Sequence, residues 1–196
     1  MARSEQLNQR MREASRRRIL VAALRLFAAH GYAGTSIRMI ASAAGISVGL
    51  LYNYFPTKAD LLGAIFERSM RDVEASFARA EEAAPADRIE QLVRSAFRIL
   101  EENRDFWRLS YGVRMQPAVV AGLGKRLRAW TKTIQSTLVR YVEEAGSTQP
   151  RVDAALLFAL IDGVSQHYVL DPRGYPLGDV ADGIVAQFAS RARRKA

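Results

Sequence analysis

Hydrophobic residues recur along the chain at the spacing of α-helices, and no segment keeps the polar–apolar alternation of a β-strand. The first such pattern predicts a helix from about Arg16 to His30, with an inward face made of Ile19, Ala23, Leu26, Phe27 and His30. Gly31 follows directly, and glycine readily adopts the left-handed conformation that ends helices. The pattern therefore predicts an amphipathic helix with a defined end.

Glycine, proline and capping residues divide the rest of the chain into further helices. They predict short helices over about residues 35–44 and 47–55, helices over 57–82, 87–103 and 105–115, and long helices over 119–145, 152–170 and 179–193. The segment Thr57-Lys58-Ala59-Asp60 resembles a capping box with Asp in place of Glu. We expect an all-α chain of about nine helices, with a second part that begins near residue 84.

Charge is distributed unevenly along these helices. The net charge is +9, from 29 basic and 20 acidic residues. Residues 1–58 hold nine basic and two acidic residues, a net charge of +7, whereas residues 59–196 have a net charge of +2. No acidic residue occurs from Ala14 to Ala59. This asymmetry predicts a polyanionic partner for the first third of the chain, either nucleic acid or an anionic membrane.

Several classes of protein are disfavoured by composition. Cysteine is absent, which removes disulfides, thiolate nucleophiles and cysteine-based zinc sites, and there are only two histidines. The start of the chain is charged and lacks the apolar run of a secretory signal, so we expect a cytoplasmic protein. The uncharged stretch from Met39 to Thr57 contains too many Gly, Pro and polar residues for a membrane span. We expect no metal, no cofactor and no catalytic site.

Residues 36–55 have the architecture of a helix-turn-helix, with two short helices joined through Gly45. A three-helix core is expected to bury Ile19, Leu26, Phe27, Ile40, Ala41, Leu51 and Phe55. The second short helix could then place its outer face and its N-terminus in the major groove of DNA. Small residues at its start, Ser47 and Gly49, would let the backbone approach phosphates.

These residues give the chain a specific resemblance. Residues 19–62 read ILVAALRLFAAHGYAGTSIRMIASAAGISVGLLYNYFPTKADLL, with F-x-x-x-G-Y, T-S-I-R, I-A-x-x-A-G-I-S and L-Y-N-Y-F-P-T-K in that order. In this order and spacing the segment, over about residues 13–73, resembles the DNA-binding domain of the TetR family of transcriptional regulators. The resemblance implies DNA contacts by Ser36, Arg38, Ser47, Val48, Gly49, Leu50, Tyr52, Asn53, Tyr54 and Lys58.

Two of these positions depart from the commoner family pattern. Val48 stands where the family often has a polar or basic residue, and Val48 and Leu50 can offer only apolar contacts, such as to thymine methyl groups. Arg38 and Asn53 would then be the main hydrogen-bonding readers of bases. Arg16, Arg17 and Arg18 are either a solvated helix start or the end of a flexible basic arm that follows a groove.

The resemblance also implies a helical C-terminal domain, residues 84–196, that forms a homodimer through its last two long helices and encloses a ligand pocket. The sequence agrees, because the helix near residues 152–170 is apolar on two faces, one for the core and one for a partner. The candidate dimer interface consists of Leu156, Leu160, Gly163, Val164, Ile184 and Phe188. The candidate ligand-binding residues are Phe106, Trp107, Tyr111, Met115, Trp130 and His167.

The aromatic cluster could line a cavity for an amphipathic or aromatic effector, or it could be packed core. Taken together, the patterns predict a ligand-responsive repressor that binds a pseudo-palindromic DNA operator as a homodimer, with no membrane partner. The alternatives are a non-inducible architectural DNA-binding dimer, a protein bound to membrane surfaces through its basic N-terminal part, and, last, a small helical enzyme.

Overall fold

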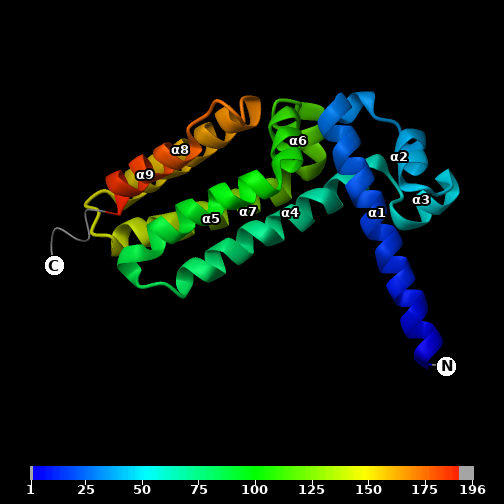
Figure 1. The fold of residues 1–196 in the computed structure, drawn as a ribbon, viewed down its shortest axis with the longest axis horizontal. Helices are drawn as coiled ribbons and strands as arrows, with labels where there is room; N and C mark the ends of the chain where they lie inside the picture. Colours follow the sequence, from blue (N-terminus) through cyan, green and yellow to red (C-terminus); the bar gives the residue numbers. More distant parts are fainter. Residues whose placement is uncertain (1, 190–196) are drawn as a thin grey trace. The chain divides into compact units, whose positions relative to one another are not determined.

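The structure is a computed structural model. It describes the backbone of residues 2–189 and the side chains of residues 5–116, 119 and 123–189. This part of the chain is all-α, as predicted, and holds no strand. Its helices are α1 (Ala2–Gly34), α2 (Ile37–Ala44), α3 (Val48–Tyr54), α4 (Lys58–Glu81), the 3-10 turn η1 (Pro85–Asp87), α5 (Arg88–Glu102), α6 (Arg104–Arg114), α7 (Pro117–Glu144), α8 (Pro150–Leu170) and α9 (Leu177–Phe188). Figure 1 follows them along the chain.

The helices form two compact units. The first unit comprises residues 1–68 and 108–122, and the second comprises residues 69–107 and 123–196. The divisions fall inside three helices, in α4 after Arg68, in α6 after Trp107 and in α7 after Gly122, so each of these helices contributes to both units.

Helix α1 is longer than its hydrophobic pattern predicts. It begins at Ala2, about 14 residues before Arg16, and the prediction of a helix start at Arg16 is wrong. Residues 5–14 are exposed and give no periodic signal, but they are rich in Gln, Arg and Glu, which favour helices. Gly31 leaves helical geometry at φ 73° and ψ 165°, as its sequence context predicts. The residues before Arg16 are therefore part of a helix rather than a flexible arm.

The first unit is built on a core between α1, α2 and α3. Six of the seven predicted core residues are buried, namely Ile19, Phe27, Ile40, Ala41, Leu51 and Phe55. Leu26 is only half-buried. His30 is exposed, so its predicted place on the inward face is wrong. The buried Thr35 hydroxyl donates to the carbonyls of Leu26 (3.1 Å) and Gly31 (2.9 Å), which ties the end of α1 to the start of α2.

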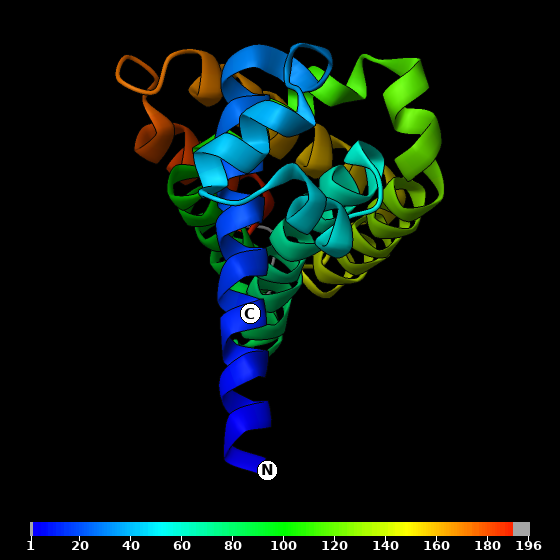
Figure 2. The ribbon, with the colours of Figure 1, turned by 90° about the vertical axis from the view of Figure 1, so that its right-hand side faces the viewer.

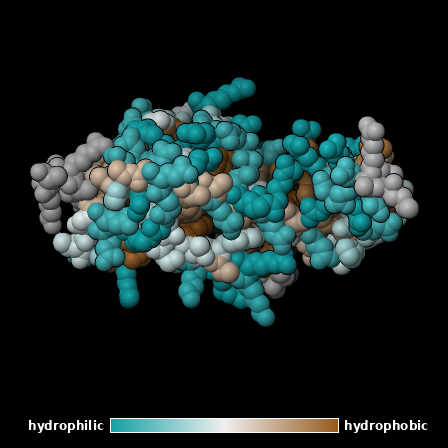
Figure 3. All heavy atoms as spheres, turned by 90° about the horizontal axis from the view of Figure 1, so that it is seen from below, coloured by the Kyte–Doolittle hydropathy of each residue, from teal (hydrophilic) through white to brown (hydrophobic). Residues whose placement is uncertain are grey.

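The second unit packs α5, α8 and α9 against one another. Its buried residues include Ile89, Val93, Phe97, Leu157 and Ile184. On the face shown in Figure 3 hydrophilic residues cover most of the surface, and hydrophobic residues appear only in small patches. This is expected of helices that bury one stripe each. The predicted last helix reaches Arg193, and its final residues, 190–193, lie outside the described residues.

Polar contacts join the ends of α4, α5 and α7 inside the second unit. The Arg140 guanidinium donates to both carboxylate oxygens of Glu81, and the Tyr141 hydroxyl donates to Glu81 at 3.0 Å. Arg88 donates to Glu144 at 2.7 Å. The hydrogen bond from Arg140, with that from Tyr141, lowers the pKa of Glu81 to about 2, so the carboxylate stays charged well into acid.

Candidate nucleic-acid interface

The turn between α2 and α3 is fixed by local chemistry. Ser36 caps α2, its hydroxyl accepting the Met39 N–H at 3.2 Å, and Ser47 caps α3, accepting the Leu50 N–H at 3.1 Å. Gly45 joins the helices at φ 67°, a left-handed conformation that other residues rarely adopt. Both caps and the glycine turn confirm the predicted helix-turn-helix architecture.

The outer face of α3 is open to solvent. Leu50 is 40% exposed and Tyr52 is 46% exposed, although both are large and partly apolar. Ser47, Gly49 and Asn53 are also exposed, while Val48 and Tyr54 are half-buried. An added Cβ at Gly49 would meet nothing within 4 Å, so the helix start offers free space to a partner. Leu51 points the other way and is buried.

Lys58 lies at the first turn of α4, beside the end of α1. Its ammonium is 4.3 Å from the centroid of the Tyr32 ring and 5.9 Å from that of Phe27. Lys58 is half-buried, and burial lowers its pKa. The capping box around it is present, since Asp60 accepts the Thr57 N–H at 3.1 Å and the Thr57 hydroxyl accepts the Asp60 N–H at 3.0 Å. The rings hold the ammonium in one place while leaving part of it accessible.

The remaining predicted DNA contacts lie on α2. Arg38 is exposed, and so is Ser36, although the Ser36 hydroxyl is used as a cap. Two ring contacts in this unit could not be predicted from spacing. Tyr32, the last residue of the F-x-x-x-G-Y motif, supports Lys58, and the Arg16 guanidinium lies 5.3 Å from the Phe55 ring centroid. Every predicted DNA-contact residue therefore belongs to one unit, and that unit is strongly basic in sequence.

The candidate ligand-binding residues are divided between the two units. Phe106 is buried and meets the half-buried Trp107 edge to face at 5.3 Å, both in the second unit. Tyr111 and Met115 belong to the first unit, where Met115 is 86% exposed and lies outside the core of this chain.

The two other candidate ligand-binding residues also lie in the second unit. Trp130 is half-buried, and His167 is exposed and stacks on Tyr175 at 6.1 Å between ring centroids. Among the candidates, Phe106 and Trp107 therefore contact each other. His167 instead packs on Tyr175, which was not a predicted site residue.

The candidate dimer residues fall into two groups. Leu156 and Leu160 are 50% and 37% exposed on α8, and an added Cβ at Gly163 would meet nothing within 4 Å. By contrast, Val164, Ile184 and Phe188 are buried within their own chain. The placement of these three side chains at the dimer interface stays a prediction that the single chain does not support, because they are buried in it.

No helix in the described part of the chain is long and apolar enough to cross a membrane. The same part holds no group of His, Asp or Glu side chains that could bind a metal ion.

Comparison with known proteins relates both parts of the chain to regulators. Residues 19–65 match the family described as bacterial regulatory proteins, tetR family. Residues 85–192, more than half of the chain, match the family described as BetI-type transcriptional repressor, C-terminal.

Individual relatives agree with these matches. The transcriptional repressor KstR of Mycolicibacterium smegmatis is 34% identical over 90 residues, which are 45% of this chain and 44% of that protein, so the match spans less than half the relative's length. The regulator BetI of Burkholderia mallei is 28% identical over 158 residues, 79% of this chain and 81% of the relative. The structure of AibR in complex with isovaleryl coenzyme A and operator DNA superposes with a TM-score of 0.75 at 23% identity, covering 89% of this chain and 98% of that chain.

The relatives are named as regulators, in agreement with the prediction that the chain is not an enzyme. The helix-turn-helix geometry, the all-α fold and the two matched families lead to one assignment: the chain belongs to the TetR family of bacterial regulatory proteins.

Proposed function

We propose that the chain is a transcriptional repressor that binds a pseudo-palindromic DNA operator as a homodimer and responds to a small amphipathic ligand. The observation that carries the proposal is the exposed outer face of α3, capped by Ser47 and set in a three-helix unit without acidic residues from Ala14 to Ala59. A helix of this kind fits the major groove, and the surrounding charge favours phosphates.

Each predicted DNA contact has a distinct task in this proposal. Asn53, exposed on α3, reads base edges by hydrogen bonds, and Tyr52 and Leu50 supply apolar contact. Ser47 and Gly49 bring the positive end of α3 close to a phosphate. Arg38 joins Asn53 in hydrogen bonding to base edges, and Val48 adds apolar contact. The remaining contacts, which set the register of the helix on the duplex, come from Ser36, Tyr54 and Lys58.

The proposed dimer contact is the solvent-facing stripe of α8. Val152, Leu156 and Leu160 follow one another at helical spacing and are exposed in the single chain, and Gly163 continues the stripe with space for close approach. Two-fold pairing through this stripe would present two copies of α3 to successive major grooves, about 34 Å or a multiple apart. Substitution of both Leu156 and Leu160 by Asp is then expected to give monomers in sedimentation analysis. Persistent dimers would exclude this surface.

The effector is proposed to bind in the C-terminal part of the chain, where Phe106 and Trp107 form an aromatic pair. AibR, which shares the fold, binds isovaleryl coenzyme A, so acyl-coenzyme A thioesters are the first class to test. A ligand can release DNA only through different affinities for the DNA-bound and free conformations.

The proposal is tested by selecting duplexes from a random pool at fixed salt concentration, without ligand and with a series of acyl-coenzyme A thioesters. Enrichment of a two-fold symmetric sequence is expected, with lower recovery when an effective thioester is present. Enrichment that no ligand changes would favour an architectural DNA-binding dimer. Absence of any enriched sequence would contradict the repressor proposal.

A further inference from the structure

The N-terminal half of α1 projects past α2 and α3, as the two views in Figures 1 and 2 agree. Arg16 marks where this projection leaves the domain, because its guanidinium rests 5.3 Å from the ring of Phe55, the residue directly after α3. From Arg16 back to Glu5 the helix continues for 11 residues, which corresponds to about 16 Å at 1.5 Å per residue. The same unit that presents α3 therefore also carries a helical extension beside it.

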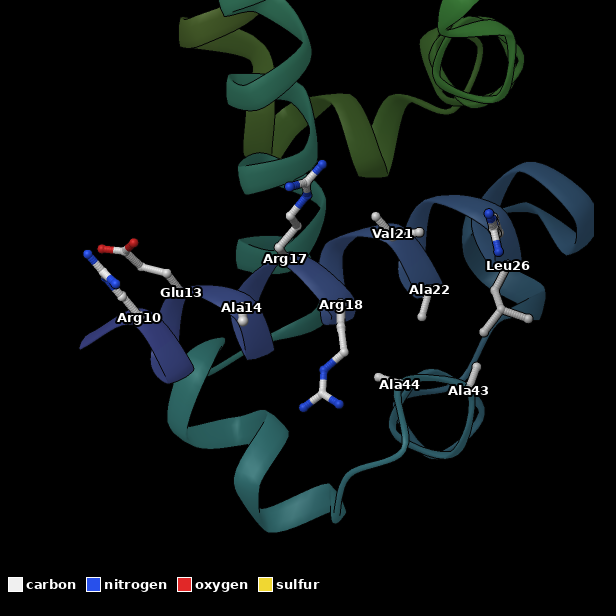
Figure 4. A pocket seen from close by; sticks show the side chains of 11 residues that line it. Arg10, Glu13, Ala14, Arg17, Arg18, Val21, Ala22, Leu26, Ala43 and Ala44 are labelled. Carbon is white, nitrogen blue, oxygen red and sulfur yellow. The ribbon is translucent and has the colours of Figure 1, made fainter. Parts of the chain in front are cut away.

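An open groove with a volume of about 920 Å³ runs along this helix where it lies beside α2 (Figure 4). Its walls include the small side chains of Ala43 and Ala44. Figure 4 shows Arg18 pointing from α1 into the space beside Ala44. The groove is also lined by three further arginines, which are Arg10, Arg17 and Arg25. We call the four arginines together the α1 arginines.

The α1 arginines are exposed and have no carboxylate partner among the residues that the structure describes. Glu13 also lines the groove, and its carboxylate accepts the Gln9 amide at 2.9 Å. A guanidinium presents its donors in a planar fork that matches phosphate oxygens. Four such groups around an open groove form a surface that attracts a chain of phosphates rather than a single ion.

We propose that the N-terminal half of α1, with the α1 arginines, is a second DNA contact that binds the phosphate backbone of the duplex flanking the half-site read by α3. This proposal rests on the proposed function. The α1 arginines are spread over 15 residues from Arg10 to Arg25, which is about 22 Å of helix and matches about six successive phosphates at about 3.4 Å each along a strand. DNA is favoured as the occupant because the same unit presents α3, and Arg16 of this helix contacts Phe55, the residue directly after α3.

A membrane surface fits this helix less well. Interfacial helices need a continuous apolar face. The exposed apolar residues Leu7 and Met11 lie on the same helical face as Arg18 and Arg25, so arginines interrupt that face.

The test uses the duplex selected from the random pool in two lengths, one trimmed to the conserved bases and one with about ten extra base pairs on each side. Affinities are measured over a series of salt concentrations. The triple variant Arg10→Ala, Arg17→Ala, Arg18→Ala is compared with the wild type. The matched control replaces three exposed arginines of the second unit, Arg98→Ala, Arg151→Ala and Arg173→Ala.

We expect the wild-type chain and the control to bind the long duplex at least tenfold more tightly than the trimmed one, with a salt slope steeper by about 0.9 for each phosphate contact. The triple variant should bind both lengths equally, with its affinity for the trimmed duplex within about threefold of the wild type. Replacing the same three arginines by Lys should restore most of the difference, because lysine retains the charge.

Equal affinity of the wild type for both lengths would overturn this inference and leave the proposed role of α3 intact. Failure of the wild type to bind either length would instead contradict the proposed function itself. Binding to phosphatidylglycerol vesicles that the triple variant loses, without any effect of DNA length, would assign the α1 arginines to membranes and overturn the inference.

Discussion

Replacing Lys58 tests the DNA interface most sharply, because different substitutions remove its charge with or without its aliphatic stem. The ammonium lies 4.3 Å from the Tyr32 ring centroid, and Lys58 as a whole is half-buried. In the folded protein the Lys58–Tyr32 contact contributes about 0.5–1 kcal/mol. In the complex, one phosphate contact contributes about 0.9 to the slope of log K against log salt.

Two substitutions distinguish these contributions. Lys58→Met keeps a flexible apolar stem of similar length and loses the charge, whereas Lys58→Ala loses both. We expect both variants to lower the salt slope by about 0.9, so that raising salt from 50 to 200 mM weakens their binding about 3.5-fold less than it weakens that of the wild type. Both variants lose the ammonium–ring contact, so both should lose about 0.5–1 kcal/mol of unfolding free energy in urea. Lys58→Ala should lose about 1 kcal/mol more, because it also removes the packing of the aliphatic stem.

The assay is a fluorescence anisotropy titration of a labelled duplex at four or more salt concentrations, with urea unfolding measured on the same samples. A salt slope that stays at the wild-type value in both variants would remove Lys58 from the phosphate contacts. A slope that falls only in Lys58→Ala would show that its packing, and not its charge, matters for DNA binding.

Three further predictions concern single side chains. Asn53→Ala should relax base preference at one or two positions of the half-site by about 1–3 kcal/mol, measured by repeating the duplex selection. Gly45→Ala should cost about 1–2 kcal/mol of unfolding free energy, because φ is 67° there, whereas Gly49→Ala, in ordinary helix, should not destabilise the domain. Glu81→Gln should flatten the fall in stability with acid. The pKa of Glu81 lies near 2, below its usual 4.5, so the stabilisation it provides is complete above about pH 4.5 and is lost as pH falls toward 2.

Each of these predictions has a result that contradicts it. An unchanged base profile for Asn53→Ala would mean that Asn53 does not read bases. Equal unfolding free energies for Gly45→Ala and wild type would refute the left-handed turn. For Glu81→Gln, an acid titration of circular dichroism that overlays the wild-type curve between pH 5 and 2 would show that the Arg140 contact does not persist in solution.

The helix-turn-helix could be predicted from the sequence because its determinants are local. Ser36 and Ser47 cap their helices, and the left-handed turn at Gly45 strongly favours glycine. The residue types at these three positions therefore specify the local geometry. The buried places of Leu51 and Phe55 followed from helical spacing. These features require no knowledge of distant parts of the chain.

Other features depend on packing between distant segments, which spacing alone does not encode. Helix α8 is apolar nearly all round, so its pattern could not tell that Val164 packs inward while Leu156 stays exposed. The contact of Lys58 with Tyr32 joins residues on different helices. The N-terminal half of α1 has no hydrophobic stripe to reveal it, because residues 5–14 are all exposed.

The central claim, that α3 lies in DNA grooves as part of a two-fold dimer, can be measured directly because the chain contains no cysteine. Asn53→Cys provides a single thiol on the exposed face of α3 for a DNA-cleaving iron chelate, and Gln135→Cys on α7 serves as the control. We predict strand cleavage at two positions related by the symmetry of the selected duplex, with none from the control. Cleavage at one position only, or a pattern identical to that of the control, would contradict this account.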